Sequence, residues 1–467
     1  MMLEPHVAAQ DEDTAWTESI VLSNNPRAWN PHLTTDPWGV VHAVWNGASN
    51  PDPQIDALTA SDMIYYSRWD GVRWTEPVNV LATPGGRRAN RPVIAAGSDG
   101  MLYVAWLSSG DIYLSSAPVD SASSVWAWAA PRVIFAGANL PYWVDLKADE
   151  RGVLHLAFVK ELADVFVISY SQSDNGGRSW SRSVEVSATK ASVAARNPRL
   201  AVDQDGTLHA TWAEVQLPDG APPLGVFYAR STDNGLTWSE PLQMAGLGYG
   251  RTNVGLSDEN TVHLVWSGTV GYEGRYHVWS ADGGQTWTEA ERLPGLEESF
   301  GTGFSEMVVD STGVLRLATG INQQRYLTWR DGIWSNPEKI ADVVHGREID
   351  REGGMPRIAL SEGNRLLVLY HDHWSVFFSS RLIDAPFRPV STSVPALPTS
   401  DASEVTDLVS TPTAAPTATV SPTLYPVAPW AGDVASSNIP QPLIAGLVPV
   451  VLLLGVAVLY QMSRRRG

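Results

Sequence analysis

The sequence of 467 residues contains no cysteine. It can therefore form no disulfide, use no thiol nucleophile and hold no zinc ion through thiolates. Cationic side chains are also scarce, because 32 Lys and Arg stand against 50 Asp and Glu, for a formal net charge of −18. Nucleic acid binding needs a basic surface, so this balance argues against a nucleic-acid partner but leaves room for a neutral or sugar-like ligand.

The N-terminal residues lack the features of an export signal. The stretch MMLEPHVAAQDEDTAW, Met1–Trp16, has no basic start and no apolar core, so it does not read as a signal peptide. Either the true start lies upstream, which we favour, or a C-terminal apolar segment alone directs insertion. We expect residues 1–15 to be disordered.

An uncharged apolar run stands near the other end of the chain. Leu443–Tyr460 has close to the ~20 residues that cross a bilayer as a helix, and three arginines, Arg464–Arg466, follow. Basic residues stay on the cytoplasmic side. The run therefore predicts a transmembrane helix over 441–462 and a basic cytoplasmic tail over 463–467. The protein would be a single-pass protein of the cell membrane, with the rest of the chain outside.

The segment before this run, residues 388–440, consists mainly of Ser, Thr, Pro and Ala. It offers too little apolar surface to offset its chain entropy, so we interpret it as an extended stalk. A buried core helix is the alternative interpretation of the apolar run. Its terminal position, basic flank and missing polar face favour the membrane.

The rest of the chain, residues 16–387, contains a repeat. A pattern resembling NPRLAVDQDGTLHATWAE, residues 197–214, returns roughly seven times at intervals of about 50 to 60 residues. Each copy predicts two alternating strands joined by an Asp/Gly turn, followed by a third and a fourth strand. Four antiparallel strands per repeat indicate an all-β β-propeller, and seven repeats predict seven four-stranded blades. The chain has 20 Trp, and a repeated blade would give these large rings a recurring place to pack.

The two ends of the repeat region complement each other. The last copy offers a third strand within 374–381 but no good fourth strand. The segment WTESIVLS, Trp16–Ser23, matches the fourth strands that begin at Trp74 and Trp287. We therefore expect the N-terminal strand to complete the last blade, which would close the ring and remove an open edge.

A short stretch, Ser-x-Asp-x-Gly-x-x-Trp, recurs between third and fourth strands. Its Asp can accept backbone hydrogen bonds, its Gly permits a positive φ, and its Trp opens the next strand. Copies in successive blades cannot converge on one substrate, so we interpret them as structural turns. The copies, the first with Asn for Asp, are Ser173, Asn175, Gly177 and Trp180; Ser231, Asp233, Gly235 and Trp238; and Ser280, Asp282, Gly284 and Trp287.

This stretch resembles the Asp-box, or BNR repeat, of the sialidase superfamily. The resemblance extends over nearly the whole repeat region and implies a propeller that is either a glycoside hydrolase or a non-catalytic receptor. Sialidases of the family have six blades and carry an Arg in a Phe-Arg-Ile-Pro-like motif. This sequence has roughly seven repeats and no such motif, with only NRPVI at Arg91 and MPRIAL at Arg357 beside a Pro. We therefore transfer no catalytic residue from the family.

Four histidines recur in the second strands, each three residues before an aromatic: His42, His155, His209 and His263. Equivalent positions in different blades lie too far apart for ligands ~2 Å from one metal ion. We therefore expect a hydrogen bond within each blade and no metal or other cofactor.

The innermost strands predict the ligand site, because they line a propeller's channel. Aligned on Leu200, the preceding positions are mostly polar, while the positions equivalent to Leu200 are all apolar. The preceding positions are His32, Val93, Asp145, Arg199, Asn253, Glu306 and Arg357, and two residues earlier lie Asn30, Arg91, Trp143, Asn197, Arg251, Phe304 and Met355.

From these positions we select the candidate ligand-binding residues His32, Arg91, Asp145, Arg199, Arg251, Asn253, Glu306 and Arg357. Carboxylates, arginines and aromatics at one level suit a sugar or a small anion. The alternative is that the polar ring only lines a water-filled channel and pairs its own charges.

The sequence thus predicts a membrane-anchored propeller that recognises a glycan or a protein at the cell surface. The second hypothesis is a sialidase-like glycoside hydrolase, an exo-α-sialidase in type, for which Asp145 and Glu306 are the first carboxylates to test. Retaining enzymes need such a pair about 5 Å apart and inverting enzymes about 6.5–9.5 Å. A scaffold for a neighbouring membrane complex is the third hypothesis.

Overall fold

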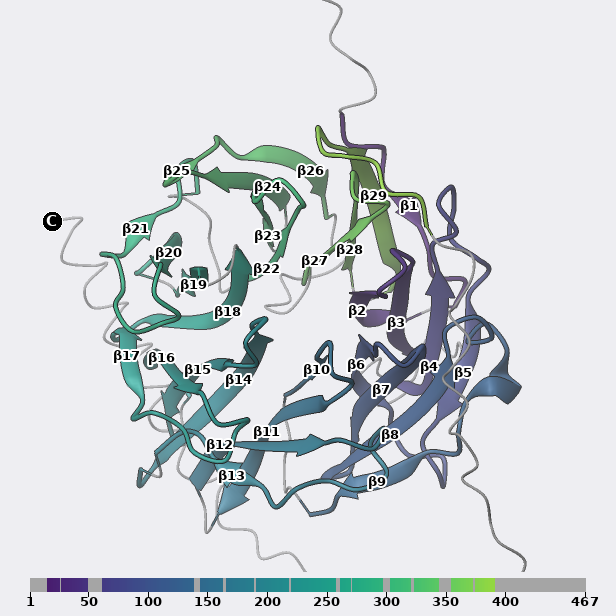
Figure 1. The fold of residues 1–467 in the computed structure, drawn as a ribbon, viewed down its shortest axis with the longest axis horizontal. Helices are drawn as coiled ribbons and strands as arrows, with labels where there is room; N and C mark the ends of the chain where they lie inside the picture. The colour runs from purple at the N-terminus through teal and green to yellow at the C-terminus, as the bar shows by residue number, and fades with distance from the viewer. Residues whose placement is uncertain are drawn as a thin grey trace, which may run out of the picture. The chain divides into compact units, whose positions relative to one another are not determined.

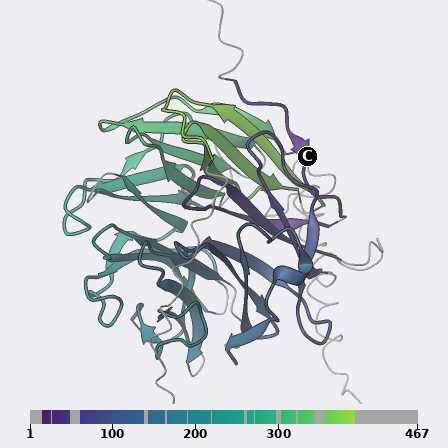
Figure 2. The same ribbon diagram turned by 45° about the vertical axis from the view of Figure 1, so that its right-hand side comes forward.

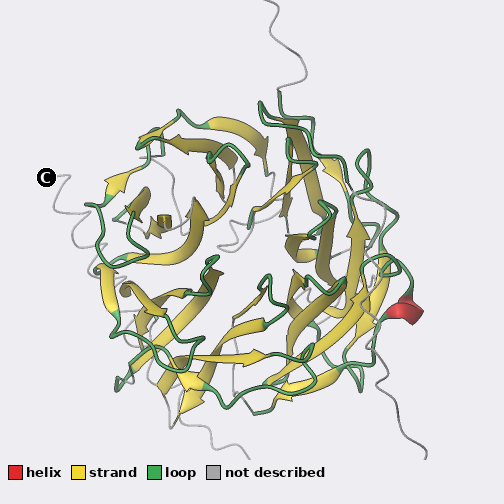
Figure 3. Ribbon diagram, in the orientation of Figure 1, coloured by secondary structure: helices red, strands yellow, loops and turns green. Residues whose placement is uncertain are grey.

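The computed structural model describes residues 15–390, except for 26, 49–60, 138–142, 163–164, 189, 218–219, 258–260, 270, 297–302, 321–322, 344–353 and 373. These residues form antiparallel sheets arranged around a centre (Figure 1). In the described part of the chain, the one helical segment is the short 3-10 helix η2 (Val125–Ala127), and strands and turns make up the rest (Figure 3).

The strands group into seven units, which we call blades and number from β2 onwards. Blade 1 contains β2 (Trp29–Thr35), β3 (Val41–Ala48), β4 (Ser61–Arg68) and β5 (Val78–Ala82). Blade 2 contains β6 (Asn90–Ala96), β7 (Met101–Ser108), β8 (Asp111–Pro118) and β9 (Arg132–Phe135). Blade 3 contains β10 (Val144–Ala148), β11 (Leu154–Leu162), β12 (Val165–Ser173) and β13 (Val184–Glu185). Blade 4 contains β14 (Val193–Val202), β15 (Leu208–Gln216), β16 (Pro223–Ser231) and β17 (Leu242–Ala245).

The remaining blades follow the same order. Blade 5 contains β18 (Tyr249–Ser257), β19 (Thr261–Gly268), β20 (Arg275–Ser280) and β21 (Glu291–Arg292). Blade 6 contains β22 (Phe304–Val309), β23 (Leu315–Gly320), β24 (Gln323–Arg330), β25 (Ile333–Trp334) and β26 (Glu338–Asp342). Blade 7 contains β27 (Arg357–Ser361), β28 (Arg365–His371) and β29 (Val376–Leu382), together with β1 (Ile20–Val21). A single parallel bridge, Phe166 to Ala194, links blades 3 and 4 into one sheet.

The N-terminal strand lies beside the last strand of the chain. Ile20 pairs with Phe378 and Val21 with Phe377, both antiparallel, and the amide of Thr17 donates to the carbonyl of Ser380 over 2.9 Å. The purple β1 next to the green β29 is visible in Figure 1, and Figure 2 gives the view after a 45° turn. This is the pairing that the sequence predicts, and it gives blade 7 its fourth strand.

The hydrophobic core lies between the blades. Each of the seven buried clusters draws its residues from two neighbouring blades, and one of them joins the last blade to the first. In that cluster Leu367 and Leu369 of blade 7 pack with Val41 and Trp45 of blade 1. A ring of four-stranded sheets packed face to face in this way is a β-propeller.

One aromatic contact recurs at the interfaces between blades. A Trp that opens the fourth strand of one blade meets a third-strand ring of the preceding blade, edge to face, with interplanar angles between 66° and 88°. The pairs and their centroid separations are Tyr66–Trp128, 5.9 Å; Tyr170–Trp238, 5.4 Å; Tyr228–Trp287, 4.9 Å; His277–Trp334, 5.0 Å; Tyr326–Trp16, 5.3 Å; and Phe378–Trp74, 6.2 Å. Trp16 therefore fills in blade 7 the place of the tryptophans that the repeat predicts.

The transmembrane helix and the stalk predicted for residues 388–462 lie outside the described residues, apart from the first three of them. Among the residues that the structure does describe, no helix has the length and apolar character to cross a membrane.

The close approach of a turn glycine to the neighbouring tyrosine makes a test of these interfaces possible. Gly283 and Gly284 both have positive φ, at 68° and 81°. A Cβ on Gly284 would stand 1.9 Å from the hydroxyl oxygen of Tyr228, whereas a Cβ on Gly283 would meet nothing within 4 Å. Both variants share the backbone strain of a non-glycine residue at positive φ, so the comparison isolates the packing.

We predict that Gly284→Ala lowers the free energy of unfolding by about 1–3 kcal/mol more than Gly283→Ala does, the range expected for overpacking. Urea unfolding of the two variants and the parent measures the difference. Equal losses in the two variants would contradict a tight contact between the turn and Tyr228.

Candidate functional site

The polar positions predicted on the innermost strands lie close enough for their charges to interact, and most of them bond to the next blade. His32, Asp145, Arg199, Asn253 and Arg357 are all at least nine-tenths buried. Four hydrogen bonds cross between blades: Ile94 N to His32 Nδ1, 3.3 Å; Leu200 N to Asp145 Oδ2, 2.8 Å; Asn253 Nδ2 to Ser305 O, 2.8 Å; and Arg357 Nε to Pro31 O, 3.1 Å. The ring therefore joins neighbouring blades, which supports the alternative that it pairs its own groups.

The charges of this ring act on one another. Burial lowers the pKa of His32 well below its ordinary value, and the positive charges of Arg357, Lys147 and Arg199 lower it further. Burial alone would raise the pKa of Glu306, but the same three cations outweigh this and hold it below its usual range. His32 is therefore neutral and Glu306 ionised at neutral pH.

The two candidate catalytic carboxylates are both engaged. Glu306 forms an ion pair with Nη1 of Arg357. Asp145 accepts the hydrogen bond from the Leu200 amide and lies 3.6 Å from the ammonium of Lys147. A general acid in a glycosidase needs a raised pKa, and the pKa of Glu306 is lowered. Their role in catalysis stays a prediction, and the contacts suit joining the blades.

A stack of four side chains lies where the innermost strands begin. The guanidinium of Arg91 lies over the ring of Trp143 at 3.7 Å, and that of Arg251 lies over Phe304 at 4.2 Å. The Trp143 and Phe304 rings come from blades 3 and 6 and lie 5.4 Å apart at 43°. Because these blades face each other across the ring, the stack bridges the centre of the ring at the start of the innermost strands, where the sequence predicts the mouth of the channel, and we call it the mouth stack.

The backbone helps to build this mouth. In four of the described first strands the register shifts near the start, which marks a β-bulge. The bulge residues Asn30, Arg91, Asn197 and Arg251 have φ of 49°, 50°, 58° and 48°. Non-glycine residues at positive φ cost about 1–3 kcal/mol each and cluster at functional sites. The same strained position thus turns both arginines of the mouth stack toward the axis.

The sequence pattern did not identify two further cations. Lys147 lies two residues after Asp145 on β10, where the strand alternation would have placed it on the same face. Arg275 lies at the start of β20, a third strand, and is almost fully buried, with Nε donating to Thr319 Oγ1 over 3.1 Å. Burial lowers the pKa of Arg275 to about 10, and the charge of Arg251 adds to the shift. Arg275 thus belongs to the cationic surroundings of the mouth.

Charge around the axis is opposite in sign to that of the whole chain. The axial residues named above include six cations and two carboxylates, Asp145 and Glu306. The cations are Arg91, Lys147, Arg199, Arg251, Arg275 and Arg357. In a chain of net charge −18, six cations against two carboxylates leave an excess of positive charge at this place, which favours an anion.

The repeated Ser-x-Asp-x-Gly-x-x-Trp stretches form local turns, one in each of blades 3, 4 and 5. In blade 4 the amide of Gly235 donates to Ser231 Oγ over 2.8 Å, and Ser231 Oγ donates to Asp233 Oδ1 over 2.7 Å. Asp233 also accepts from the amide and hydroxyl of Thr237, and these bonds lower its pKa to about 2. These bonds of Ser231 and Asp233 stay within the turn, as a structural role predicts.

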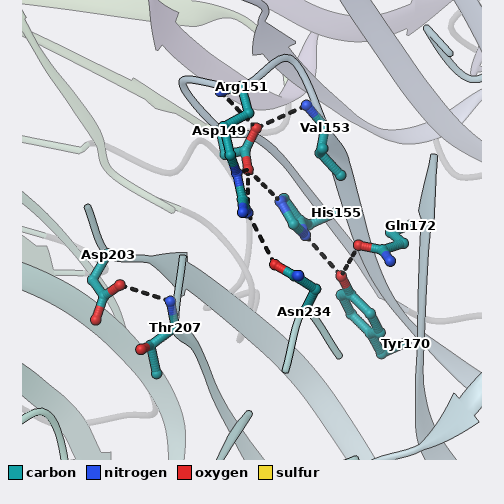
Figure 4. A network of polar contacts seen from close by, with 9 residues as sticks. All are labelled: Asp149, Arg151, Val153, His155, Tyr170, Gln172, Asp203, Thr207 and Asn234. Atoms are coloured by element: carbon teal, nitrogen blue, oxygen red, sulfur yellow. Dashed lines mark hydrogen bonds and ion pairs between the residues drawn. The ribbon is translucent and has the colours of Figure 1, made fainter. Parts of the chain in front are cut away.

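The recurring histidines form the predicted hydrogen bonds within their blades. In blade 3, Nδ1 of His155 lies 2.7 Å from the hydroxyl of Tyr170, and Nε2 lies 3.4 Å from Asp149 (Figure 4). The same bond joins His42 to Tyr66 and His209 to Tyr228, while His263 meets Ser257 and His277. These tyrosines are the rings that the tryptophans of the next blade contact. In the described ranges no group of three or more acidic or His side chains could hold a metal ion.

No protein family model matches this chain, and no curated protein matches it. Among solved structures, it is similar to an ulvan lyase of polysaccharide lyase family 25, solved with bound -[GlcA(1-4)Rha3S]-. The TM-score is 0.53 at 10% identity, over 77% of this chain and 95% of that one. It is also similar to the sialidase Hz136, described as a Hadza microbial sialidase, with a TM-score of 0.44 at 15% identity, over 76% and 66% of the chains. The NanB sialidase of Streptococcus pneumoniae gives 0.44 at 13%, over 79% and 70%.

The similarity to the lyase shows the fold. At 10% identity the likeness to the lyase concerns architecture alone, and the two sialidase matches are too distant to support an argument. The neighbours of this chain are thus propellers that include enzymes acting on carbohydrates.

The buried histidines predict how stability depends on pH. Burial lowers the pKa of His155, although the carboxylate of Asp149 acts in the opposite direction, and burial also lowers the pKa of His42 and His263. An unfolded His titrates near 6.5. Below that pH the unfolded chain binds more protons than the folded chain, so the free energy of unfolding falls as the pH drops.

We predict that the free energy of unfolding declines from pH 6.5 to pH 5, and that His155→Gln makes this decline shallower. One such His contributes up to about 1.4 kcal/mol per pH unit. Urea unfolding at pH 8, 7, 6 and 5 measures both slopes, and the slopes between pH 7 and 8 serve as the control because an unfolded His, with its pKa near 6.5, is already mostly neutral there. Identical slopes for parent and variant between pH 6.5 and 5 would show that His155 titrates normally in the folded state.

Proposed function

We propose that this chain is a cell-surface β-propeller, seven-bladed and closed by its N-terminal strand, that binds an acidic carbohydrate at the mouth of its channel. The observation that carries the proposal is the concentration of arginines around the axis of an otherwise acidic protein. The mouth stack supplies the two kinds of group that such a ligand needs, guanidinium and aromatic ring.

Each part of the mouth stack has a chemical use. Arg91 and Arg251 can form charge-assisted hydrogen bonds with a carboxylate or a sulfate, which are about twice as strong as neutral ones. The half-buried ring of Trp143 offers an apolar face to the C–H groups of a sugar. Held by the bulges and by their stacking partners, these groups need little reordering when a ligand binds.

The neighbouring ulvan lyase suggests a first ligand to try. It was solved with -[GlcA(1-4)Rha3S]-, a disaccharide with a carboxylate and a sulfate. A ligand of this class would match the charge at the mouth of this propeller. At 10% identity the similarity is a reason to choose this ligand as a probe, but it assigns no role to any residue of this chain.

The proposed location rests on the sequence. The apolar run Leu443–Tyr460, followed by Arg464–Arg466, would anchor the chain with the propeller outside, and residues 388–440 would serve as the stalk. A propeller held away from the membrane in this way is suited to recognising ligands at the cell surface. A protein ligand at the same mouth is the alternative, and it would also have to carry acidic groups.

We predict that an oligosaccharide of glucuronate and sulfated rhamnose binds the full chain in a detergent without a sugar head group, and that Arg91→Ala and Arg251→Ala each weaken binding about 10- to 100-fold. This is the loss expected for one hydrogen bond between charged groups, about 1.5–3 kcal/mol. Isothermal titration calorimetry measures it. Arg73→Ala is the matched control, because Arg73 is largely exposed on the turn between β4 and β5, away from the mouth.

Two outcomes would contradict this function. Binding that Arg91→Ala and Arg251→Ala leave unchanged would move the site away from the mouth. Release of product from a fluorogenic sialoside, lost in Asp145→Asn and Glu306→Gln, would favour the glycoside hydrolase instead. Those two variants need an unfolding curve as well, because both carboxylates also join neighbouring blades.

A further inference from the structure

Blade 2 departs from the repeat at two neighbouring positions. In blade 3, His155 pairs with Gln172, and the tyrosine that bonds to it, Tyr170, lies two residues earlier on the third strand. In blade 2 the position of the histidine is taken by Tyr103, which pairs with Ser116. The position of the tyrosine is then taken by Leu114, a smaller side chain without a ring or a hydroxyl.

The interface between blades 2 and 3 changes accordingly. Trp180 opens the fourth strand of blade 3, but the third strand of blade 2 offers it no ring at this position. It packs instead on Phe135, 6.2 Å away, and on the cluster that includes Leu114. A hollow of about 790 Å³ lies beside this interface, with Leu114 and Tyr103 in its wall. Ligand pockets typically measure about 300–1,000 Å³.

Three arginines from different segments line this hollow: Arg132 on β9, Arg151 on the turn after β10, and Arg178 on the turn after β12. Arg132 donates to the carbonyl of Gly176 over 3.3 Å. Arg151 donates to Asp149 over 2.8 Å and to Asn234 of blade 4 over 3.1 Å (Figure 4). Two of the three guanidiniums are thus held in place by the protein.

Carboxylates balance these charges. Asp149 holds Arg151, Asp99 accepts a hydrogen bond of 2.5 Å from Tyr103, and the exposed Asp174 lies at the same wall. Three arginines and two carboxylates thus line the hollow, and Asp149, beside it, pairs with one of the arginines, in contrast to the cationic mouth. Such a wall offers donors and acceptors side by side, as uncharged hydroxyl groups need. The half-buried Trp38 adds apolar surface for the C–H face of a sugar ring.

The hollow continues toward blade 4. A second hollow of about 400 Å³ shares Arg151 and Asp174 with the first and adds Trp180, Gln172 and Asn234 to the wall. Together they make a groove along blades 2, 3 and 4. Its length suits a chain of sugars more than a single one.

This groove and the mouth stack lie at opposite ends of the blades. Trp143 of the mouth stack precedes β10, and Asp149 beside the groove follows it. Six residues of strand at ~3.3 Å each separate them by roughly 20 Å. One ligand unit cannot fill both places.

We propose that the groove formed by Tyr103, Leu114, Arg132, Arg151, Arg178 and Trp180 is a second carbohydrate site, which binds a neutral oligosaccharide. The leucine in place of the repeated tyrosine leaves Trp180 without its usual ring partner beside the groove, and the balanced arginines and carboxylates select uncharged hydroxyl groups. It is independent of the acidic ligand proposed for the mouth.

Binding of neutral hexasaccharides to the full chain tests this proposal. Cello-, xylo-, manno- and chitohexaose are each titrated against the protein in a detergent without a sugar head group, and binding is followed by saturation-transfer NMR and calorimetry. We expect at least one of them to bind. Arg178→Ala should weaken it about 10-fold, the value of a lost hydrogen bond to a charged group. Ala130→Trp, at an exposed position on the groove wall, should abolish binding without affecting folding.

A repeat-restoring variant gives a second, independent arm. Tyr103→His combined with Leu114→Tyr recreates the pair found in blades 1, 3 and 4 and changes the wall by removing the Tyr103 hydroxyl that bonds to Asp99, so it should lose binding while the melting temperature is kept. If that variant does not fold, Arg178→Ala and Ala130→Trp still test the proposal. Arg91→Ala at the mouth is the control and should leave binding of the neutral ligand unchanged.

Three results would overturn the proposal: no hexasaccharide binds the parent, binding survives Ala130→Trp, or Arg91→Ala abolishes it. If the acidic oligosaccharide does not bind at the mouth while a neutral hexasaccharide still binds, only the proposed function is overturned.

Discussion

The contact between a fourth-strand tryptophan and a third-strand ring of the preceding blade is the interaction on which this structure depends. It recurs at six of the interfaces among the described blades. Edge-to-face pairs contribute about 0.5–1.5 kcal/mol beyond their burial. The contact also explains the neighbouring residues, because the turn glycine makes room for the tyrosine and the histidine holds its hydroxyl. The last pair uses Trp16, so the N-terminal strand is bound into the ring by the same means.

Much of the fold could be predicted from the sequence because residues with the same structural role recur at the same position of each repeat. Trp16 matches the fourth strands of other copies, and it takes their place beside Tyr326. His155 recurs at one position, and it makes the expected bond within its blade. The candidate site was harder to predict. Alternation along a strand shows that Asp145 faces the axis, but not that it bonds to Leu200 of the next blade, since the spacing of blades is a property of packing.

The departures from the repeat mark the two candidate sites. At the mouth, the axial position holds a different side chain in each blade, and opposite blades bring Trp143 and Phe304 together. On the turn face, the change is a smaller residue, Leu114, where other blades have a ring. The repeat shows the substitution, but only the packed structure shows that a hollow lies beside it. One end of the propeller is thus cationic and the other balanced, which is why an acidic ligand is proposed for the first and a neutral one for the second.

The most direct test of the tryptophan contact is a double-mutant cycle at the point where the chain ends meet. Unfolding free energies are measured for the parent, Trp16→Leu, Tyr326→Leu and the double variant. The account predicts a coupling of about 0.5–1.5 kcal/mol, as expected for an edge-to-face pair, and a similar value for Trp287 and Tyr228. A coupling of zero between Trp16 and Tyr326, with a clear one between Trp287 and Tyr228, would contradict the claim that the N-terminal strand completes the ring.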